Sequence, residues 1–324
     1  MDPSGTEALV TVVLTTYDRR DFLPRAIETV VEQTYDAIEL VVVDDHSPKS
    51  PADIVENASH EGLRDVTFIR HEENRGASAA RNTGIKRANG EFVALLDDDD
   101  LWTPDKIERQ VATFDRSGEA VGAVCTGIKS VDSDGRIIRS RAAEFNGKIT
   151  KQLLCGATVP LPSVLVRRDL LTDGELFDER LQSYEDLEWM IRLSRRCEFR
   201  SVSDPLLISV REGHTQKSDK TSTKAEEGYP LLMEKCQPIA AEYGWLFKRK
   251  MIARWSFRVG YTSLVHGQAK QARKFIQTAI LTWPFAPEFY LYGLFATLGD
   301  QWYERAQSLK RRLERYRHEL TASA

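Results

Sequence analysis

The chain has 324 residues, of which 41% are hydrophobic and 29% are charged, and this composition excludes collagen-like, disulfide-scaffold and wholly disordered proteins. At roughly 150 residues per domain, the length allows about two domains with a sizeable core. The net charge of −4 gives no general reason to expect nucleic acid as a partner. The four cysteines, Cys125, Cys155, Cys197 and Cys236, lack paired or metal-binding spacing, which predicts four buried thiols in a reducing compartment.

Charge and aromatic residues are divided unevenly along the chain. Residues 245–324 hold 14 Lys and Arg but only 5 Asp and Glu, a net charge of +9, whereas residues 1–244 carry −13. The same C-terminal residues contain 15 of the 29 aromatic side chains. An acidic body followed by a basic, aromatic-rich region predicts two regions with different roles.

In chain order, the first third of the chain alternates between short apolar runs and amphipathic segments. The runs predict strands over 10–16, 38–43, 66–69 and 92–96, and the amphipathic segments predict helices over 21–34, 76–87 and 104–114. This alternation is typical of βαβ units with a parallel sheet. Three of the strands lead into polar clusters, at 15–18, 44–47 and 97–100. Ligands of such sheets bind at the carboxyl ends of the strands, so we expect the three clusters to line a binding edge.

From residue 121 the pattern is less regular, and from residue 225 it is helical. We expect strands over 121–131, 137–139, 164–166 and 206–210, helices over 184–195 and 288–298, and a further helix between Gly267 and Pro284. The change in pattern predicts an α/β domain at residues 1–222 and a helical domain at residues 223–324.

Four consecutive aspartates, Asp97 to Asp100, directly follow the predicted strand 92–96. Adjacent carboxylates repel one another unless cations are present. Alternate residues of an extended chain point to the same side, so Asp97 and Asp99 can share one target. Their hard oxygen ligands suit Mg²⁺ or Mn²⁺, which predicts a divalent-cation site, while the alternative is a solvated acidic loop.

Six short motifs occur in an order that resembles family 2 glycosyltransferases. They are Thr15-Thr16-Tyr17-Asp18-Arg19, Asp44-Asp45-His46-Ser47, Asn74-Arg75-Gly76 with Ala80-Arg81-Asn82-x-Gly84, Asp97-x-Asp99-Asp100, Glu185-Asp186, and His214 with Ser218. Thr15, Asp18 and His46 depart from the family's usual Pro, Asn and Gly. The resemblance covers roughly residues 8–220 and implies the GT-A fold, a Rossmann-like, mostly parallel sheet flanked by helices, here followed by an all-α C-terminal region.

The resemblance also implies roles for individual residues. It assigns donor binding to Thr16, Tyr17, Asp18, Asp44, Asp45, Arg75, Arg81, Asp97 and Asp98. It assigns an Mn²⁺ or Mg²⁺ ion to Asp99, with Asp97 and His214. Asp186, next to Glu185, would be the base that deprotonates the acceptor hydroxyl.

Three of these residues have a structural alternative that the sequence leaves open. Asp186 lies at a helix start, where acidic residues commonly act as caps. Arg81 can pair with a carboxylate at the edge of the sheet. His214 can be a surface histidine of a polar loop, rather than a ligand on a loop that closes over the donor.

The function that the resemblance implies is inverting, metal-dependent hexosyl transfer from a UDP- or GDP-sugar to a hydroxyl acceptor, a lipid-linked or cell-envelope glycan. One alternative is a sugar-1-phosphate nucleotidyltransferase, which would need a Gly-rich basic loop that residues 17–21 do not supply. The other is a catalytically inactive carbohydrate-binding or scaffold protein, which predicts loss of an acidic site residue, yet Asp97, Asp99 and Asp186 are all present.

The C-terminal region allows two interpretations. Residues 260–284 resemble a tetratricopeptide-type helical hairpin, which favours an appendage packed on the catalytic domain. The basic and aromatic composition instead favours contact with an anionic membrane surface. Prolines and Glu288 interrupt the apolar run 279–299, so we expect no simple spanning helix there, and the N-terminal residues lack a signal-peptide pattern. These features predict a cytoplasmic protein, peripheral on the cytoplasmic face of the membrane.

Overall fold

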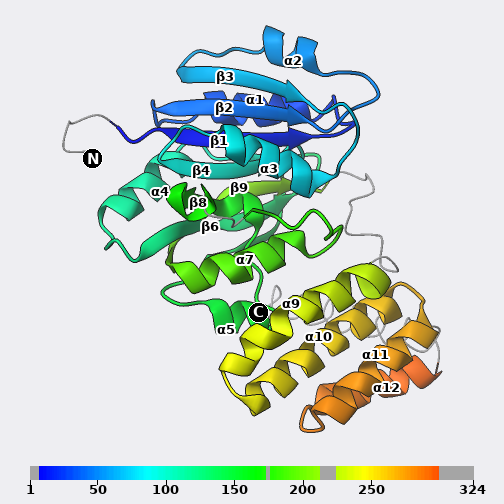
Figure 1. Ribbon diagram of the computed structural model, residues 1–324. Helices are drawn as coiled ribbons and strands as arrows, with labels where there is room; N and C mark the ends of the chain where they lie inside the picture. The colour runs from blue at the N-terminus through cyan, green and yellow to red at the C-terminus, as the bar shows by residue number, and fades with distance from the viewer. Residues whose placement is uncertain (1–6, 173–175, 212–223, 299–324) are drawn as a thin grey trace, which may run out of the picture. The chain divides into compact units, whose positions relative to one another are not determined.

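The computed structural model describes residues 7–172, 176–211 and 224–298 (Figure 1). The chain divides into two compact units. Residues 1–153 with 157–214 form one, called the α/β unit below, and residues 154–156 with 215–324 form the other, the helical unit. The expected domain boundary between residues 222 and 223 lies outside the described residues.

The α/β unit is built on one mixed sheet. Its strands are β1 Val10–Thr16, β2 Ile38–Asp44, β3 Leu63–Arg70, β4 Phe92–Asp97, β5 Asp100–Trp102, β6 Val121–Val131, β7 Ile137–Arg141, β8 Val164–Arg167 and β9 Glu198–Val210. The order is β3-β2-β1-β4-β8-β6-β9-β5, with β7 paired to β6. Strands β1 to β4 are mutually parallel, whereas β8 runs antiparallel to β4 and β6 (Figure 1). The expected α/β class is confirmed, and the predicted motifs between Thr15 and Asp99 lie on or beside its parallel strands.

Among the described residues, seven α-helices accompany this sheet. They are α1 Leu23–Val31, α2 Ala52–Asn57, α3 Ala77–Arg87, α4 Lys106–Asp115, α5 Thr150–Leu154, α6 Asp169–Thr172 and α7 Glu185–Arg196. In α1 the buried residues are Leu23, Ala26, Ile27 and Val30, the spacing of one helical face.

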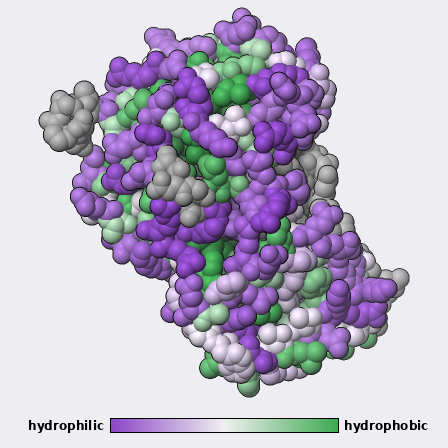
Figure 2. Space-filling view, in the orientation of Figure 1, coloured by the Kyte–Doolittle hydropathy of each residue, from purple (hydrophilic) through white to green (hydrophobic). Residues whose placement is uncertain are grey.

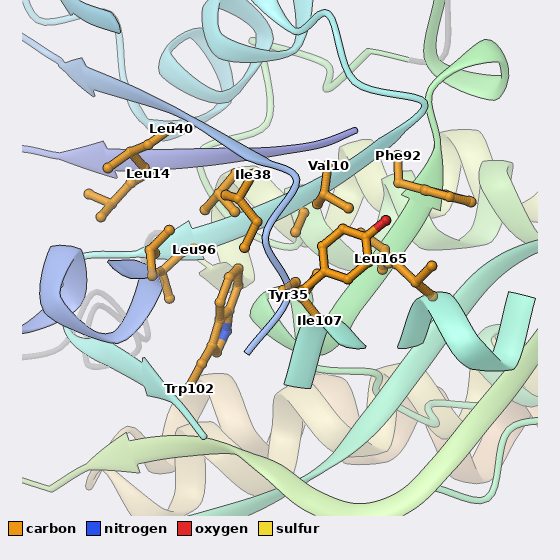
Figure 3. Close-up of a cluster of buried hydrophobic side chains, with 14 of the residues drawn as sticks. Val10, Leu14, Tyr35, Ile38, Leu40, Phe92, Leu96, Trp102, Ile107 and Leu165 are labelled. Atoms are coloured by element: carbon orange, nitrogen blue, oxygen red, sulfur yellow. The ribbon is translucent and has the colours of Figure 1, made fainter. Parts of the chain in front are cut away.

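The main core lies between this helix face and the sheet. It includes Leu14, Leu40 and Leu96 from neighbouring strands, all 4% exposed or less (Figure 3). Burying a leucine side chain stabilises the fold by about 1.5–3 kcal/mol. All residues of β1 and β2 are buried, which explains why both strands are apolar without alternation.

Helix α3 approaches the sheet closely at Gly84. A Cβ atom at this position would lie 2.1 Å from Val13 Cγ1 on β1, so only glycine fits. The close approach holds α3, and with it Arg81, against the parallel strands. The glycine of the third motif therefore has a packing role.

The described part of the helical unit contains helices only. They are a π-helical turn Lys224–Gly228, α9 Tyr229–Glu242, α10 Trp245–Val265, α11 Ala269–Thr282 and α12 Pro287–Leu298. Ala272 and Ile276 of α11 are buried with Leu264 of α10 and Ala296 of α12. No described helix is long and apolar enough to cross a membrane. The expected all-helical pattern is confirmed, and the tetratricopeptide-type hairpin stays a prediction.

Three features of the structure differ from the local sequence pattern. Strand β9 begins at Glu198, well before the expected start, because residues 198–202 pair in parallel with β6. Residues Asp100–Trp102 form β5, which pairs with the far end of β9, although the aspartates were expected to form a single polar cluster. Cys155 is half-buried, so the expectation of four buried thiols is wrong for this residue.

Candidate active site

The carboxyl ends of β1, β2 and β4 meet at one edge of the sheet. The strand register places Thr16 beside Asp44 and Thr15 beside Asp97. Three motifs that are far apart in sequence are thereby brought together. This is the edge at which α/β sheets bind ligands.

Both aspartates of the second motif shape the loops at this edge. Asp44 is fully buried, and its carboxylate accepts hydrogen bonds from the Ser47 N–H at 2.9 Å and the Arg70 guanidinium at 2.6 Å. The Asp45 carboxylate accepts from the backbone N–H groups of Arg75 and Gly76 at 2.9 and 2.7 Å. A contact of either aspartate with a nucleobase stays a prediction.

A histidine fixes the Asp45 side chain further. The Nδ1 atom of His71 lies 2.8 Å from Asp45 Oδ1, and its Nε2 atom lies 2.9 Å from the Thr83 hydroxyl on α3. The imidazole is 7% exposed, so this chain of contacts is shielded from water. It joins the end of β2 to the helix that carries Arg81.

The acidic turn after β4 is held by residues of the first motif. The Thr16 hydroxyl donates to Asp98 at 2.7 Å, and the Arg19 guanidinium contacts Asp98 at 3.0 Å and Asp99 at 2.6 Å. Burial raises the pKa of Asp98 to about 6, even though its hydrogen bonds with Thr16 and Arg19 favour the ionised form. Arg19 was not among the expected site residues, although it closes the first motif.

The expected divalent-cation ligands Asp97 and Asp99 lie in the acidic turn. The carboxylates of Asp97 and Asp99 are 31% and 20% exposed, so both remain accessible. Burial raises the pKa of Asp100, and the charges of Asp97 and Asp99 raise it further. Mg²⁺ is usually held by one or two carboxylates plus substrate phosphates.

The protein alone supplies only part of such a site. Among the described residues, no three His, Cys, Asp or Glu side chains are grouped to hold a metal ion. His214, the third expected ligand, lies outside the described residues.

Arg81 connects the acidic turn to helix α7. Its side chain is 8% exposed, and its Nη2 atom lies 2.7 Å from Asp97, while Nη1 lies 3.5 Å from Glu185. These carboxylates keep the pKa of Arg81 raised although burial opposes the charge. Its Nε and Nη1 atoms are buried without a hydrogen-bond partner among the residues described. Arg81 therefore lies beneath the site, paired with the expected metal and base motifs.

The expected base lies in the first turn of α7. The Asp186 residue is exposed, although surrounding protein desolvates its carboxyl group. This desolvation and the neighbouring charge of Glu185 raise its pKa, while the Leu187 N–H, 2.7 Å away, and Arg81 oppose the shift. The N-cap position itself belongs to Tyr184, so Asp186 is not the N-cap residue.

Backbone strain is concentrated at this edge of the sheet. Asp18, His46 and Tyr184 have φ angles of 53°, 65° and 63°, and they are the non-glycine residues with positive φ in the described part of the chain. Such a residue costs about 1–2 kcal/mol in the left-handed region, which Gly and Asn adopt more easily. This explains why the family pattern has Asn and Gly where this chain has Asp18 and His46.

The other expected donor residues lie at the surface of the site. Tyr17 is 47% exposed and follows β1 directly. The Arg75 guanidinium forms an exposed ion pair with Glu179 at 3.1 Å, in the loop before α7. Both side chains are available to a ligand, and their roles stay predictions.

Residues 11–170 match the sequence model of glycosyl transferase family 2. The α/β unit carries a family 2 glycosyltransferase domain. Of the relatives, an uncharacterized glycosyltransferase of Rickettsia bellii is 26% identical over 211 residues, which are 64% of this chain and 30% of that protein. TuaG of Bacillus subtilis, whose name marks it as a candidate glycosyltransferase of teichuronic acid biosynthesis, is 37% identical over 103 residues, or 32% of this chain and 40% of TuaG. The chain spans about 30% of the length of the Rickettsia relative.

Solved structures show the same fold at lower identity. S. aureus TarS 1–349 in complex with UDP-GlcNAc has a TM-score of 0.65 and 21% identity, over 84% of this chain and 81% of TarS 1–349. The mannosyltransferase PcManGT from Pyrobaculum calidifontis, in complex with GDP-Man and Mn²⁺, has a TM-score of 0.52 and 17% identity, over 92% and 88%. The glycosyltransferase domain of this chain therefore has the GT-A fold.

Proposed function

We propose that this protein is an inverting, metal-dependent glycosyltransferase that moves a sugar from a UDP- or GDP-sugar to a hydroxyl acceptor. The observation that carries the proposal is the buried guanidinium of Arg81, which contacts both Asp97 and Glu185. One charged network thus joins the acidic turn suited to a metal–diphosphate to the helix start suited to a base.

Asp186 is the proposed general base. It takes the proton of the acceptor hydroxyl, which requires its carboxylate form, and the Leu187 N–H and Arg81 favour that form against desolvation. Glu185 stays paired with Arg81 and orients the start of the helix. A single base on one side of the sugar suits direct displacement with inversion.

The acidic turn is the proposed site for Mn²⁺ or Mg²⁺. Asp99, with Asp97, would hold the ion, which when bound neutralises the diphosphate leaving group. Arg19 and Arg81 supply compensating positive charge at the same turn. The nucleotide sugars printed for TarS and PcManGT, UDP-GlcNAc and GDP-Man, support a nucleoside-diphosphate donor.

The helical unit supports an acceptor at a membrane surface. Trp245, Leu281 and Phe285 are 66%, 70% and 77% exposed. Arg249 connects Trp245 to the end of α11, because its guanidinium lies 5.0 Å from the Trp245 ring and donates to the carbonyls of Leu281 at 3.3 Å and Thr282 at 2.9 Å. Figure 2 shows apolar surface on the helical unit, in green, among polar side chains. We call Trp245, Leu281 and Phe285 with Arg249 the aromatic edge.

Exposed aromatic side chains beside cations suit the interface of an anionic membrane. We infer that the aromatic edge holds the enzyme on the cytoplasmic face of the membrane, where lipid-linked and envelope glycans are assembled. The name of TuaG, which refers to teichuronic acid biosynthesis, supports an acceptor of this class.

A donor screen tests the proposed function. Purified full-length protein is incubated with UDP- and GDP-sugars and Mn²⁺, with and without EDTA, and release of the nucleoside diphosphate is measured. We expect release from one donor class, its loss in EDTA, and strongly reduced release by Asp186→Asn. Release that EDTA leaves unchanged would overturn the metal dependence, and no release from any donor would overturn the proposed activity.

A further inference from the structure

A recess lies within the helical unit. Its volume is about 300 Å³, and its walls come from the middle of α10, the start of α12 and the segment 154–156. Its lining includes Gly156, Arg254, Trp255, Phe257, Arg258 and Glu288. None of them belongs to the motifs of the glycosyltransferase domain.

Two arginines of α10 face this recess. Arg254 and Arg258 lie four positions apart, so they emerge from the same side of the helix, and both are exposed. No ion pair joins either guanidinium to a carboxylate among the residues that the structure describes. Arg81 and Arg19 of the α/β unit, in contrast, each contact two carboxylates. The recess therefore holds two neighbouring positive charges whose natural counter-charge is an anion.

The wall behind these arginines is rigid. Trp255 is 1% exposed, and its indole N–H donates to the Leu154 carbonyl at 2.8 Å. Arg258 donates to the Gly156 carbonyl at 3.1 Å, and its guanidinium lies 5.0 Å from the Trp255 ring. Gly156 has a φ of +94°, a conformation that other residues rarely adopt. One guanidinium is thus held in place before any ligand arrives, which lowers the entropy lost on binding.

The remaining lining indicates what the anion is attached to. Glu288, at the start of α12, offers a carboxylate that accepts hydrogen bonds from hydroxyl groups, and Phe257 is half-buried and apolar. An inorganic anion would contact only Arg254 and Arg258 and would leave Glu288 and Phe257 without a favourable contact. A saccharide with both hydroxyl and acidic groups can contact all three: its acidic group the arginines, its hydroxyls Glu288, and its ring Phe257.

We propose that this recess binds a phosphate or carboxylate group carried by a sugar of the acceptor glycan. Arg254 and Arg258 bind the anionic group through charge-assisted hydrogen bonds, and Glu288 accepts hydrogen bonds from neighbouring hydroxyls. The proposal rests on the proposed function only in naming the acceptor as the source of the sugar. The recess then holds an acidic acceptor through the helical unit, independently of the donor.

Titration calorimetry on the full chain tests this site, in EDTA and without nucleotide. The ligands are glucose 6-phosphate, glucuronate, glucose and inorganic phosphate, and anionic vesicles are tested in a separate assay. The variant R254Q/R258Q is compared with K270Q/R273Q, which removes two exposed charges from α11 of the same unit. We expect glucose 6-phosphate or glucuronate to bind the wild type and the control, and to bind R254Q/R258Q about tenfold more weakly or worse.

Each other result overturns the proposal. If R254Q/R258Q and K270Q/R273Q bind the acidic sugars with equal affinity, the two arginines do not form the site. If glucose binds as strongly as the acidic sugars, the site does not recognise an anionic group. If inorganic phosphate binds as tightly as glucose 6-phosphate, the site does not recognise the sugar that carries the phosphate. An effect of R254Q/R258Q on vesicles alone would assign the arginines to lipid phosphate. Because the titration contains no donor, its failure leaves the donor screen unaffected, and failure of the screen leaves the titration interpretable.

Discussion

The α/β unit buries the guanidinium of Arg81 against Asp97 and Glu185, whereas the guanidinium groups of Arg254 and Arg258 on α10 of the helical unit lie on the surface. Apolar side chains show the opposite distribution. Of the thirteen large hydrophobic side chains exposed in the described residues, ten belong to the helical unit. The two units of one chain therefore place charge and apolar surface in opposite ways.

This difference indicates a different role for each unit. Burying charged groups costs several kcal/mol per ion before partners compensate, so a buried network such as that around Arg81 is retained for the geometry it imposes. Exposed apolar groups beside cations gain nothing within the folded chain and instead suit a partner surface. Chemistry should thus depend on single buried charges in the α/β unit, and attachment on exposed groups in the helical unit.

The largest effect is expected at Asp186. The variant Asp186→Asn removes the proposed base and should lower turnover by about 10²–10⁴-fold, the usual contribution of acid–base catalysis, with donor affinity near that of the wild type. Steady-state kinetics and donor titration measure the two quantities. The control Asp53→Asn changes an exposed carboxylate that pairs with Arg20 and belongs to none of the motifs, so it should keep full turnover. Transfer by Asp186→Asn within a few-fold of wild type would point to another base.

The same residue sets the acid side of the activity profile. Desolvation and the charge of Glu185 raise the pKa of Asp186. As the pH falls, its carboxylate form, and with it kcat/KM, should therefore begin to decrease at a higher pH than for an ordinary aspartate. The variant Glu185→Gln removes that neighbouring charge and should move the acid limb of the profile to lower pH. An unchanged limb in Glu185→Gln would contradict the coupling of the two carboxylates.

Asp99→Asn should abolish metal-dependent donor binding while the fold stays intact. The neutral amide removes one of the two accessible carboxylates of the acidic turn, and it also removes a partner of Arg19. Calorimetric titration with the nucleoside diphosphate and Mn²⁺ checks this result. Asp105→Asn, a nearby carboxylate that pairs with Arg109, serves as the control. Unchanged affinity in Asp99→Asn would exclude Asp99 as a ligand.

The aromatic edge gives the corresponding test in the helical unit. The double variant Trp245→Ser, Phe285→Ser should weaken co-sedimentation with anionic vesicles by about tenfold, because two exposed rings no longer enter the interface. The control Ile137→Ser, Ile138→Ser removes two equally exposed side chains from β7 of the α/β unit and should bind as the wild type does. Added salt should weaken the electrostatic part of binding in all three proteins. Equal binding of the two double variants would favour a non-membrane role for the aromatic edge.

The smallest effect is expected at Lys106, whose buried amino group has no acidic partner among the residues that the structure describes. Its amino group donates to Gln110 at 2.7 Å and lies 3.9 Å from the Trp102 ring, and burial holds its pKa well below the usual 10.5. Between that lowered pKa and 10.5 the unfolded chain binds more protons than the folded protein, so stability rises with pH across this range.

Lys106→Met removes this dependence and should raise the free energy of unfolding at neutral pH by about 1–2 kcal/mol, with the gain shrinking towards pH 10.5. Denaturant unfolding at several pH values measures the difference. Lys86→Met, at an exposed position of α3, should leave both stability and its pH dependence unchanged. A loss of stability in Lys106→Met at all pH values would show that the amino group is needed for packing at Gln110 and Trp102.

Local sequence determined much of this fold and the identity of its motifs. Strand β1 has the expected bounds, because its continuous β-branched and apolar residues specify a buried strand by themselves. Strand β6 also has the expected bounds. The order of the motifs was enough to identify the glycosyltransferase domain, and the match over residues 11–170 agrees with it. The acidic turn could be predicted from local sequence too, because its aspartates directly follow an apolar strand.

Only the tertiary structure decided which of these residues act together. Arg81 could have paired with any carboxylate at the sheet edge, and the close packing of α3 at Gly84 selects Asp97 and Glu185. The early start of β9 and the recess beside Arg254 likewise depend on contacts between segments far apart in the chain. Periodicity and spacing report the local conformation of a segment, whereas partner choice for buried charges and the shape of a recess arise from packing, which no single segment of sequence encodes.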